Sequence, residues 1–114
     1  MATAAVDLAH LARYTGGDMA LNAEILRLFD SQASEMVARL QSIIDARDAK
    51  SWREVTHTLK GAARGIGAFG LGDAAAAAEP IDPSADSITA AAALQSLQSN
   101  TSAVQYFIKS YLGA

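Results

Sequence analysis

Residues 18–46 read DMALNAEILRLFDSQASEMVARLQSIIDA, and this stretch decides the fold class. Its apolar residues recur at about 100° per residue, which is the period of an α-helix, and no alternating β-branched run indicates a strand. Asp18 is a suitable N-cap, and the predicted helix ends near Ala46. The apolar residues cover roughly half of the helix circumference. So wide an arc predicts that this helix packs on more than one neighbouring helix, or that one apolar edge of it stays exposed for a partner protein.

Further helical segments are predicted on both sides of this stretch, separated by breaks rich in glycine, proline and aspartate. They cover about residues 4–14, the chain from Asp48 to about Gly67, residues 69–79 before Pro80, and a final helix capped by Ser84 or Asp86 that runs almost to the end. Gly67 can adopt the left-handed conformation that commonly ends a helix.

Short connections between four substantial helices predict an all-α fold, an antiparallel four-helix bundle with a short additional N-terminal helix. The length of 114 residues fits one domain, expected over residues 1–114. In the final helix the apolar positions recur at a 3-4-3-4-3 spacing, which is typical of a narrow bundle seam. These positions are Leu94, Leu97, Thr101, Val104, Ile108 and Tyr111.

Composition excludes several classes of function. The chain has no cysteine, so it can form no disulfide, no thiolate nucleophile and no Cys-based metal site. Nine Lys and Arg residues against twelve Asp and Glu residues argue against a nucleic-acid-binding surface. The apolar runs are too short to span a bilayer and the N-terminus does not read as a signal peptide. We therefore expect a cytoplasmic, monomeric protein that binds no membrane and no metal.

The predicted helix over residues 49–67 has two distinct faces. A core face carries Trp52, Val55, Leu59, Ala62, Ala63 and Ile66. The other face carries Arg53, His57, Lys60, Gly61 and Arg64, so every ionisable residue on it can be cationic. We refer to these five residues as the basic stripe. A histidine lies in its middle, away from the core.

The basic stripe has the residue types needed to carry a phosphoryl group. A neutral imidazole is a good nucleophile at physiological pH, and the phosphoryl charge needs fixed cations nearby. Lys60 follows His57 by three residues, so its ammonium can reach the phosphoryl oxygens. Arg53 and Arg64 extend the positive field along the same face. The alternative is an ordinary solvated basic face.

Gly61 lies one turn after His57 on the same face. Glycine inside a helix costs about 0.8–1.0 kcal/mol relative to alanine, so its presence in an alanine-rich chain needs a reason. One reason is the close approach of a second protein to the imidazole, and the alternative is a packing contact with a neighbouring helix. The other histidine, His10, has no comparable surroundings and is expected to be structural or solvent-facing.

Residues 57–79, HTLKGAARGIGAFGLGDAAAAAE, resemble the signature of histidine-containing phosphotransfer (HPt) domains. The matching positions are His57, Leu59, Lys60, Gly61, Gly67, Leu71 and Glu79. Upstream, YTGGDMALNAEILRLF at residues 14–29 resembles the family's Gly-Gly-Asp turn into a long helix. The resemblance covers about Leu8 to Glu79.

The resemblance implies a helical bundle in which His57 accepts a phosphoryl group from an aspartyl phosphate on a receiver domain and passes it to another receiver. It implies that Lys60 stabilises the phosphorylated state and that Gly61 keeps the site accessible, with Arg53 and Arg64 in support. Glu79 would orient the other imidazole nitrogen, or would simply lie at a surface helix terminus.

The resemblance also implies the partners. They would be receiver domains of response regulators, together with a hybrid histidine kinase. The chain would bind no cofactor and would have no autonomous catalysis, because Mg²⁺ would be held by the receiver. An apolar docking rim is expected on the second helix near His57, with Phe29 and Ala33 as its candidates.

Two other functions fit parts of the sequence. A helical adaptor without phosphate chemistry, a pseudo-HPt domain, would bind a receiver or another acidic partner through the basic stripe, although it would not need the histidine. The dimerisation and phosphoacceptor part of a histidine kinase would follow its histidine with an acid and then a proline. Here Thr58 follows, and Pro80 is the first proline after it.

Overall fold

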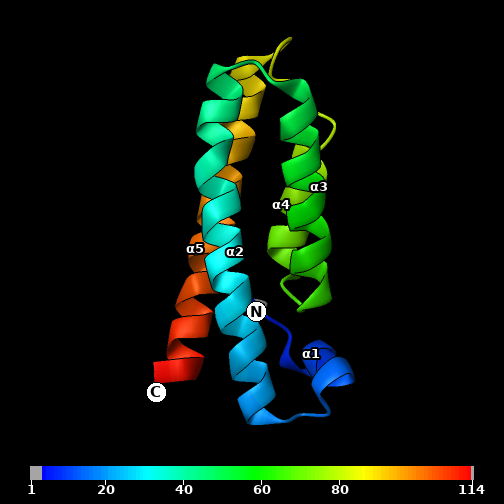
Figure 1. The fold of residues 1–114 in the computed structure, drawn as a ribbon, viewed down its shortest axis with the longest axis vertical. Helices are drawn as coiled ribbons and strands as arrows, with labels where there is room; N and C mark the ends of the chain where they lie inside the picture. The colour runs from blue at the N-terminus through cyan, green and yellow to red at the C-terminus, as the bar shows by residue number, and fades with distance from the viewer. Residues whose placement is uncertain (1–3, 114) are drawn as a thin grey trace.

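Every predicted helix is present in the computed structural model, which describes residues 4–113 (Figure 1). The helices are α1 (Leu8–Thr15), α2 (Met19–Asp45), α3 (Ala49–Gly65), α4 (Phe69–Ala78) and α5 (Ser87–Gly113). The described part of the chain contains no strand. Residues 1–3 and 114 of the predicted domain lie outside it.

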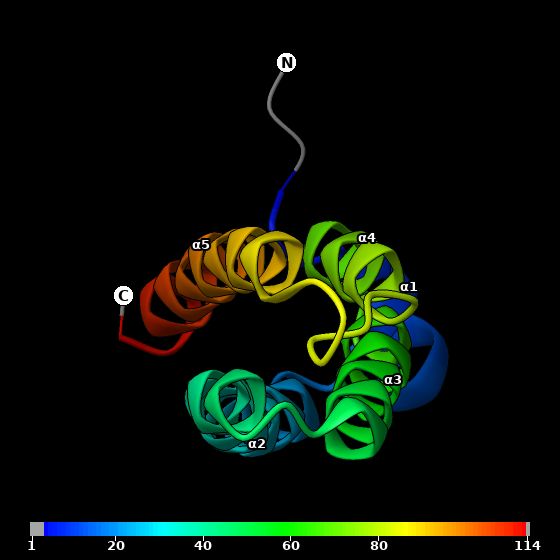
Figure 2. The ribbon, with the colours of Figure 1, turned by 90° about the horizontal axis from the view of Figure 1, so that it is seen from above.

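Helices α2 to α5 form an antiparallel four-helix bundle, and α1 lies beyond one end of α3 (Figure 1). Seen along the bundle, α2, α3, α4 and α5 follow one another around a shared core, and α5 closes the ring against α2 (Figure 2). The largest fully buried side chains are Trp52, Leu11, Leu26, Leu40, Leu59, Leu71, Leu97 and Ile108. The predicted fold class is thus confirmed.

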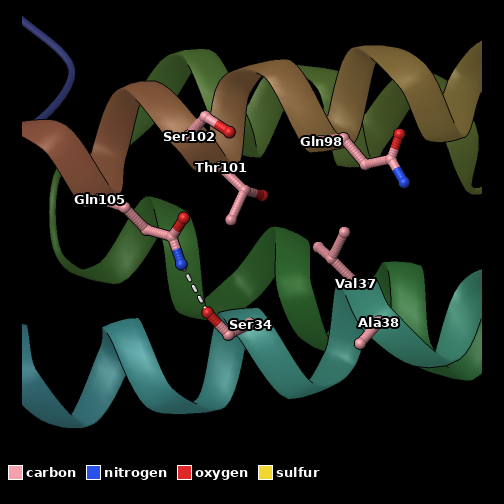
Figure 3. A pocket seen from close by; sticks show the side chains of 7 residues that line it. All are labelled: Ser34, Val37, Ala38, Gln98, Thr101, Ser102 and Gln105. Carbon is pink, nitrogen blue, oxygen red and sulfur yellow. Dashed lines mark hydrogen bonds between the residues drawn. The ribbon is translucent and has the colours of Figure 1, made fainter.

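The wide apolar arc of α2 is explained by its two neighbours, since α2 packs on α3 along one side and on α5 along the other. On the α5 side the contact includes polar groups (Figure 3). The Gln105 amide donates to Ser34 Oγ at 2.5 Å and to Asp30 Oδ1 at 3.0 Å, which joins the two helices. Most of the arc is therefore used inside the bundle.

Aspartates begin the three longest helices. The Asp18 carboxylate accepts hydrogen bonds from backbone N–H groups in the first turn of α2, and Asp48 does the same for α3. At α5 the cap is Asp86, whereas Ser84 donates its backbone N–H and its hydroxyl to Asp82. Of the two candidate caps for the last helix, Asp86 is the one used.

Gly67 ends α3 as predicted, with a φ of +86° in the left-handed region. The Ala68 N–H donates to the carbonyl of Ala63 at 2.8 Å, which closes the helix end. Asp7 packs against this turn, because its N–H donates to the Gly67 carbonyl at 2.9 Å. Asp7 also caps α1, so that helix begins at Leu8 rather than at the predicted residue 4.

Gly70 and Gly72 lie within α4. Gly72 is buried at the contact with α3, where a Cβ would meet Arg64 Cγ at 2.8 Å. The glycine therefore allows close approach of the two helices. Among residues 4–113, no helix combines the length and apolarity that crossing a bilayer requires.

Candidate functional site

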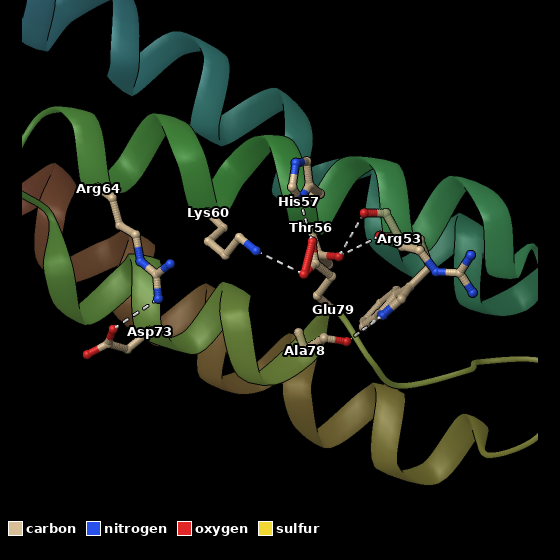
Figure 4. A network of polar contacts seen from close by, with 9 residues as sticks. Arg53, Thr56, His57, Lys60, Arg64, Asp73, Ala78 and Glu79 are labelled. Atoms are coloured by element: carbon tan, nitrogen blue, oxygen red, sulfur yellow. Dashed lines mark hydrogen bonds and ion pairs between the residues drawn. The ribbon is translucent and has the colours of Figure 1, made fainter.

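The two predicted faces of α3 are confirmed. Trp52, Val55 and Leu59 point into the core, whereas His57 lies outside it with 69% of its side chain exposed. Along the outer face Arg53, His57, Lys60 and Arg64 follow one another, with α4 running beside them (Figure 4). The imidazole therefore stands on the surface of the bundle, flanked by cationic side chains.

Glu79 brings α4 into the site. It follows the last residue of α4, and its carboxylate reaches across to α3 (Figure 4). Glu79 Oε1 lies 2.5 Å from Nδ1 of His57, and Oε2 lies 2.9 Å from the ammonium of Lys60. Only 23% of the Glu79 side chain and 21% of the Lys60 side chain are exposed. Of the two predicted placements for Glu79, the structure has the contact with the imidazole.

These contacts decide which nitrogen of a neutral His57 ring carries the proton. Hydrogen bonds from Lys60, and then from His57, hold the pKa of Glu79 below its ordinary value. An ionised carboxylate can only accept hydrogen bonds, so Nδ1 must donate. The lone pair of a neutral ring is then on Nε2, the nitrogen on the far side of the imidazole from Glu79.

Gly61 leaves the surface beside the imidazole open. A Cβ placed on Gly61 would meet no atom of the described residues within 4 Å, apart from its own helix backbone and chain neighbours. The explanation by packing against a neighbouring helix is therefore wrong. Access to His57 is the explanation that agrees with this geometry.

The outer cations of the basic stripe are exposed, and one of them lies within ion-pair distance of an acidic group. Arg64 Nη2 lies 3.7 Å from Asp73 Oδ1 on α4. Hydrogen bonds from Ser84 lower the pKa of Asp82, and the positive charge of Arg53 contributes a smaller part. The pairs of Lys60 with Glu79 and of Arg64 with Asp73 offset part of the positive field that the sequence predicted.

The family model described as Hpt domain matches residues 24–105, well over half of the chain. This chain belongs to the HPt domain family. The matched region holds His57, Lys60, Gly61 and Glu79 together. HPt domains are helical phosphocarrier modules that interact with receiver domains and kinases in phosphorelays. Comparison with curated proteins and with solved structures gave no significant match.

The predicted docking residues of this HPt domain are wrong. Phe29 is 4% exposed and Ala33 is 1% exposed, because both point into the bundle core. The apolar side chains that α2 leaves accessible include Leu28, which is 59% exposed, and the half-buried Met36. The wide apolar arc of α2 did not show which of its edges the neighbouring helices cover.

A shallow groove between α2 and α3 adjoins the face of α3 that carries His57. Its lining residues are Gln32, Glu35, Met36, Arg39, Thr58 and Ala62. Thr58 and Ala62 directly follow His57 and Gly61 in α3. Leu28 precedes Gln32 by one helical turn and so continues the same side of α2.

His10 is apart from this site. It is half-buried, and its ring packs edge-on against Tyr14 and Phe69, with centroid distances of 5.8 and 5.0 Å. Residues 4–113 of the HPt domain contain no group of three or more His, Asp or Glu side chains that could hold a metal ion.

Proposed function

We propose that this HPt domain relays a phosphoryl group between receiver-domain aspartates through Nε2 of His57. The observation that carries the proposal is the exposed imidazole whose Nδ1 is held by Glu79 at 2.5 Å. This contact leaves the nucleophilic lone pair on the opposite ring nitrogen, which is the arrangement that an incoming phosphoryl group requires.

The proposed transfer is a direct displacement at phosphorus. Nε2 donates its lone pair to the phosphorus of an aspartyl phosphate, and the bond between phosphorus and the aspartate oxygen breaks. The aspartate leaves as a carboxylate with the electron pair. The proton on Nδ1 stays beside Glu79, and the positive charge that the ring gains is balanced by this carboxylate. The return transfer to another receiver reverses each step.

Lys60 and Gly61 support this step in different ways. The ammonium of Lys60 lies on the same helical face as His57 and can neutralise charge on the phosphoryl oxygens. Gly61 leaves room for the receiver to bring its aspartate to bonding distance. Arg53 and Arg64, both exposed, contribute a weaker and more distant field. Any Mg²⁺ is expected in the receiver, so this chain would act as a phosphoryl carrier without autonomous catalysis.

The receiver is proposed to dock on the groove between α2 and α3. Met36 and Ala62 are the apolar residues that line the groove, and the exposed Leu28 lies one helical turn before the lining residue Gln32 on α2. Gln32, Glu35 and Arg39 form a polar rim of mixed charge. An apolar centre with a polar rim is the usual composition of a specific protein interface. This surface replaces Phe29 and Ala33 as the proposed docking site.

The experiment that tests the function is incubation with a panel of receiver domains that carry labelled aspartyl phosphate. The wild type should acquire acid-labile label on His57, and His57→Gln should acquire none while keeping its helical circular dichroism spectrum. His10→Gln is the matched control and should be labelled normally. Label on His57→Gln, or no label on the wild type from any receiver, would reject the phosphoacceptor role and favour the adaptor.

A further inference from the structure

Given the phosphoacceptor role proposed for His57, we infer that the Glu79 carboxylate makes the phosphorylated state short-lived, so that this domain passes the phosphoryl group on rather than storing it. Glu79 holds two groups on which the lifetime of a phosphohistidine depends. One is the ring proton on Nδ1, and the other is the ammonium of Lys60.

The ring proton controls the leaving group. When the bond between nitrogen and phosphorus breaks, its electron pair returns to Nε2. A ring that keeps its Nδ1 proton then leaves as neutral imidazole, whereas a deprotonated ring would have to leave as the much more basic imidazolate. Because an ionised Glu79 can only accept, its hydrogen bond holds the ring proton on Nδ1. Its carboxylate therefore favours departure of the phosphoryl group.

The ammonium of Lys60 controls how well the phosphoryl charge is neutralised. A phosphoryl group at neutral pH carries about −1.5 to −2 charge. Lys60 is the cation of the stripe with the least exposed side chain, and its Nζ already lies 2.9 Å from Glu79 Oε2. Glu79 competes with the phosphoryl oxygens for this ammonium and adds a negative charge across the ring. Both effects act against the attraction between the Glu79 carboxylate and the positive ring, and we expect them to outweigh it because the phosphoryl group carries the larger charge.

The two arginines of the basic stripe do not make up for the positive charge that Glu79 takes up from Lys60. Arg64 faces Asp73, and Arg53 lies near enough to Asp82 to lower its pKa in part. Two of the three Lys and Arg side chains of the basic stripe are thus paired with acidic side chains of α4 and its C-terminal end, Lys60 with Glu79 and Arg64 with Asp73. Glu79 is the member of this set that touches both the imidazole and its nearest cation, so its charge should have the largest effect.

The test uses Glu79→Gln in the full chain. Phosphoramidate, a small-molecule phosphoryl donor, loads His57 without any receiver, and mass spectrometry of peptides locates the label. We expect the half-life of phosphorylated His57 to be roughly two- to fivefold longer in Glu79→Gln than in the wild type, the size expected for a partly exposed ion pair. A half-life that is unchanged or shorter would overturn the inference.

Two further variants make the result specific. Asp73→Asn removes one negative charge from the same surface without touching His57 or Lys60, and its half-life should equal that of the wild type. If Asp73→Asn lengthened the half-life as much as Glu79→Gln does, the effect would come from the overall negative charge of the surface, and the specific role of Glu79 would be overturned. Adding Lys60→Ala to Glu79→Gln should remove part of the gain, since the released ammonium would then be missing. If the double variant kept the full increase in half-life, Glu79 and the phosphoryl group would not be competing for Lys60, and this part of the inference would be overturned.

The two proposals can fail separately. If phosphoramidate labels His57 but no receiver exchanges the label, the relay function fails while the effect of Glu79 on the half-life can still be measured. If receivers exchange the label normally and Glu79→Gln changes no half-life, the relay stands and the role of Glu79 fails.

Discussion

The indole Nε1 of Trp52 donates a 2.9 Å hydrogen bond to the carbonyl oxygen of Ala78, the residue directly before Glu79. Trp52 is fully buried in the first turn of α3, and Ala78 is the last residue of α4. A core contact thereby fixes the point at which α4 ends and the carboxylate of Glu79 reaches His57. The position of Glu79 at the exposed His57 thus depends on Trp52, which is buried and lies five residues before His57 in α3.

Trp52→Phe should lower the free energy of unfolding by about 1–3 kcal/mol, because the Ala78 carbonyl loses its buried donor and the smaller ring leaves a cavity. Urea denaturation followed by circular dichroism measures this loss. The ¹⁵N chemical shifts of His57 should also move, since Glu79 is held less firmly. Wild-type stability together with unchanged shifts would contradict the anchoring role.

Lys60→Ala should shorten the half-life of phosphorylated His57 several-fold, because the nearest cation to the phosphoryl oxygens is removed. Lys60→Arg keeps the charge and should retain most of the half-life. Decay of acid-labile label at neutral pH measures both variants. If the label decayed equally fast in the wild type and in Lys60→Ala, Lys60 would not stabilise the phosphorylated state.

Gly61→Ala should separate stability from function. The new methyl group enters open space and improves helix propensity, so the free energy of unfolding should rise by up to about 1 kcal/mol. Phosphotransfer from a receiver should nevertheless slow several-fold, because the methyl group crowds the approach to His57. Gly65, also exposed on α3 with open space around it, is the matched control. Gly65→Ala should transfer at the wild-type rate, and equal slowing in both variants would argue against steric access.

Substitutions on α2 should distinguish the docking surface from the core. Leu28→Ala and Met36→Ala should raise the apparent KM for a phosphorylated receiver by about two- to tenfold, with little loss of stability for the exposed Leu28 and a moderate loss for Met36, which packs against the core. Phe29→Ala should instead lower the free energy of unfolding by about 3–5 kcal/mol, because its side chain is buried. Tyr106→Ala, on exposed α5 surface, is the control and should change neither quantity. Normal KM values for Leu28→Ala and Met36→Ala would place docking elsewhere.

The fold should weaken in acid through four carboxylates. The pKa of Asp48 is lowered mainly by hydrogen bonds from Ser51, and neighbouring donors likewise lower the pKa values of Glu79, Asp82 and Asp86. A pKa that is lower in the folded chain means that the unfolded chain takes up protons first as the pH falls. The stabilisation is thus fully present above the ordinary values of 3.8 for Asp and 4.5 for Glu, and is lost as the pH falls through the lowered ones.

Urea titrations between pH 7 and pH 3 measure this dependence. The free energy of unfolding should be nearly constant from neutral pH to about pH 5 and should then decline. Asp86→Asn should be less stable than the wild type at pH 7, and the difference should shrink as the pH falls through the lowered pKa of the wild-type carboxyl. A difference that stays constant across the range would show that the charge of Asp86 does not contribute to stability.

The positions of the helices could be predicted because the signals for them are local. The apolar period of residues 18–46, the aspartate at the start of each long helix and the left-handed glycine at residue 67 each act within a few residues of chain. The same local geometry separates the core face of α3 from the face that carries His57. The start of α1 was predicted four residues too early, although its N-cap Asp7 is also a local signal, and Asp7 is held in addition by its hydrogen bond to the Gly67 carbonyl.

By itself, the sequence determined where each long helix lies, which face of α3 carries His57, and that Lys60 and Gly61 share this face. Only the tertiary structure decided that Glu79 holds His57 and Lys60, that Phe29 and Ala33 are buried, and that Arg64 of the stripe pairs with Asp73. The physical reason is that helical periodicity fixes directions around one helix axis. The rotation and register of one helix against another come from side-chain packing between segments far apart in the chain.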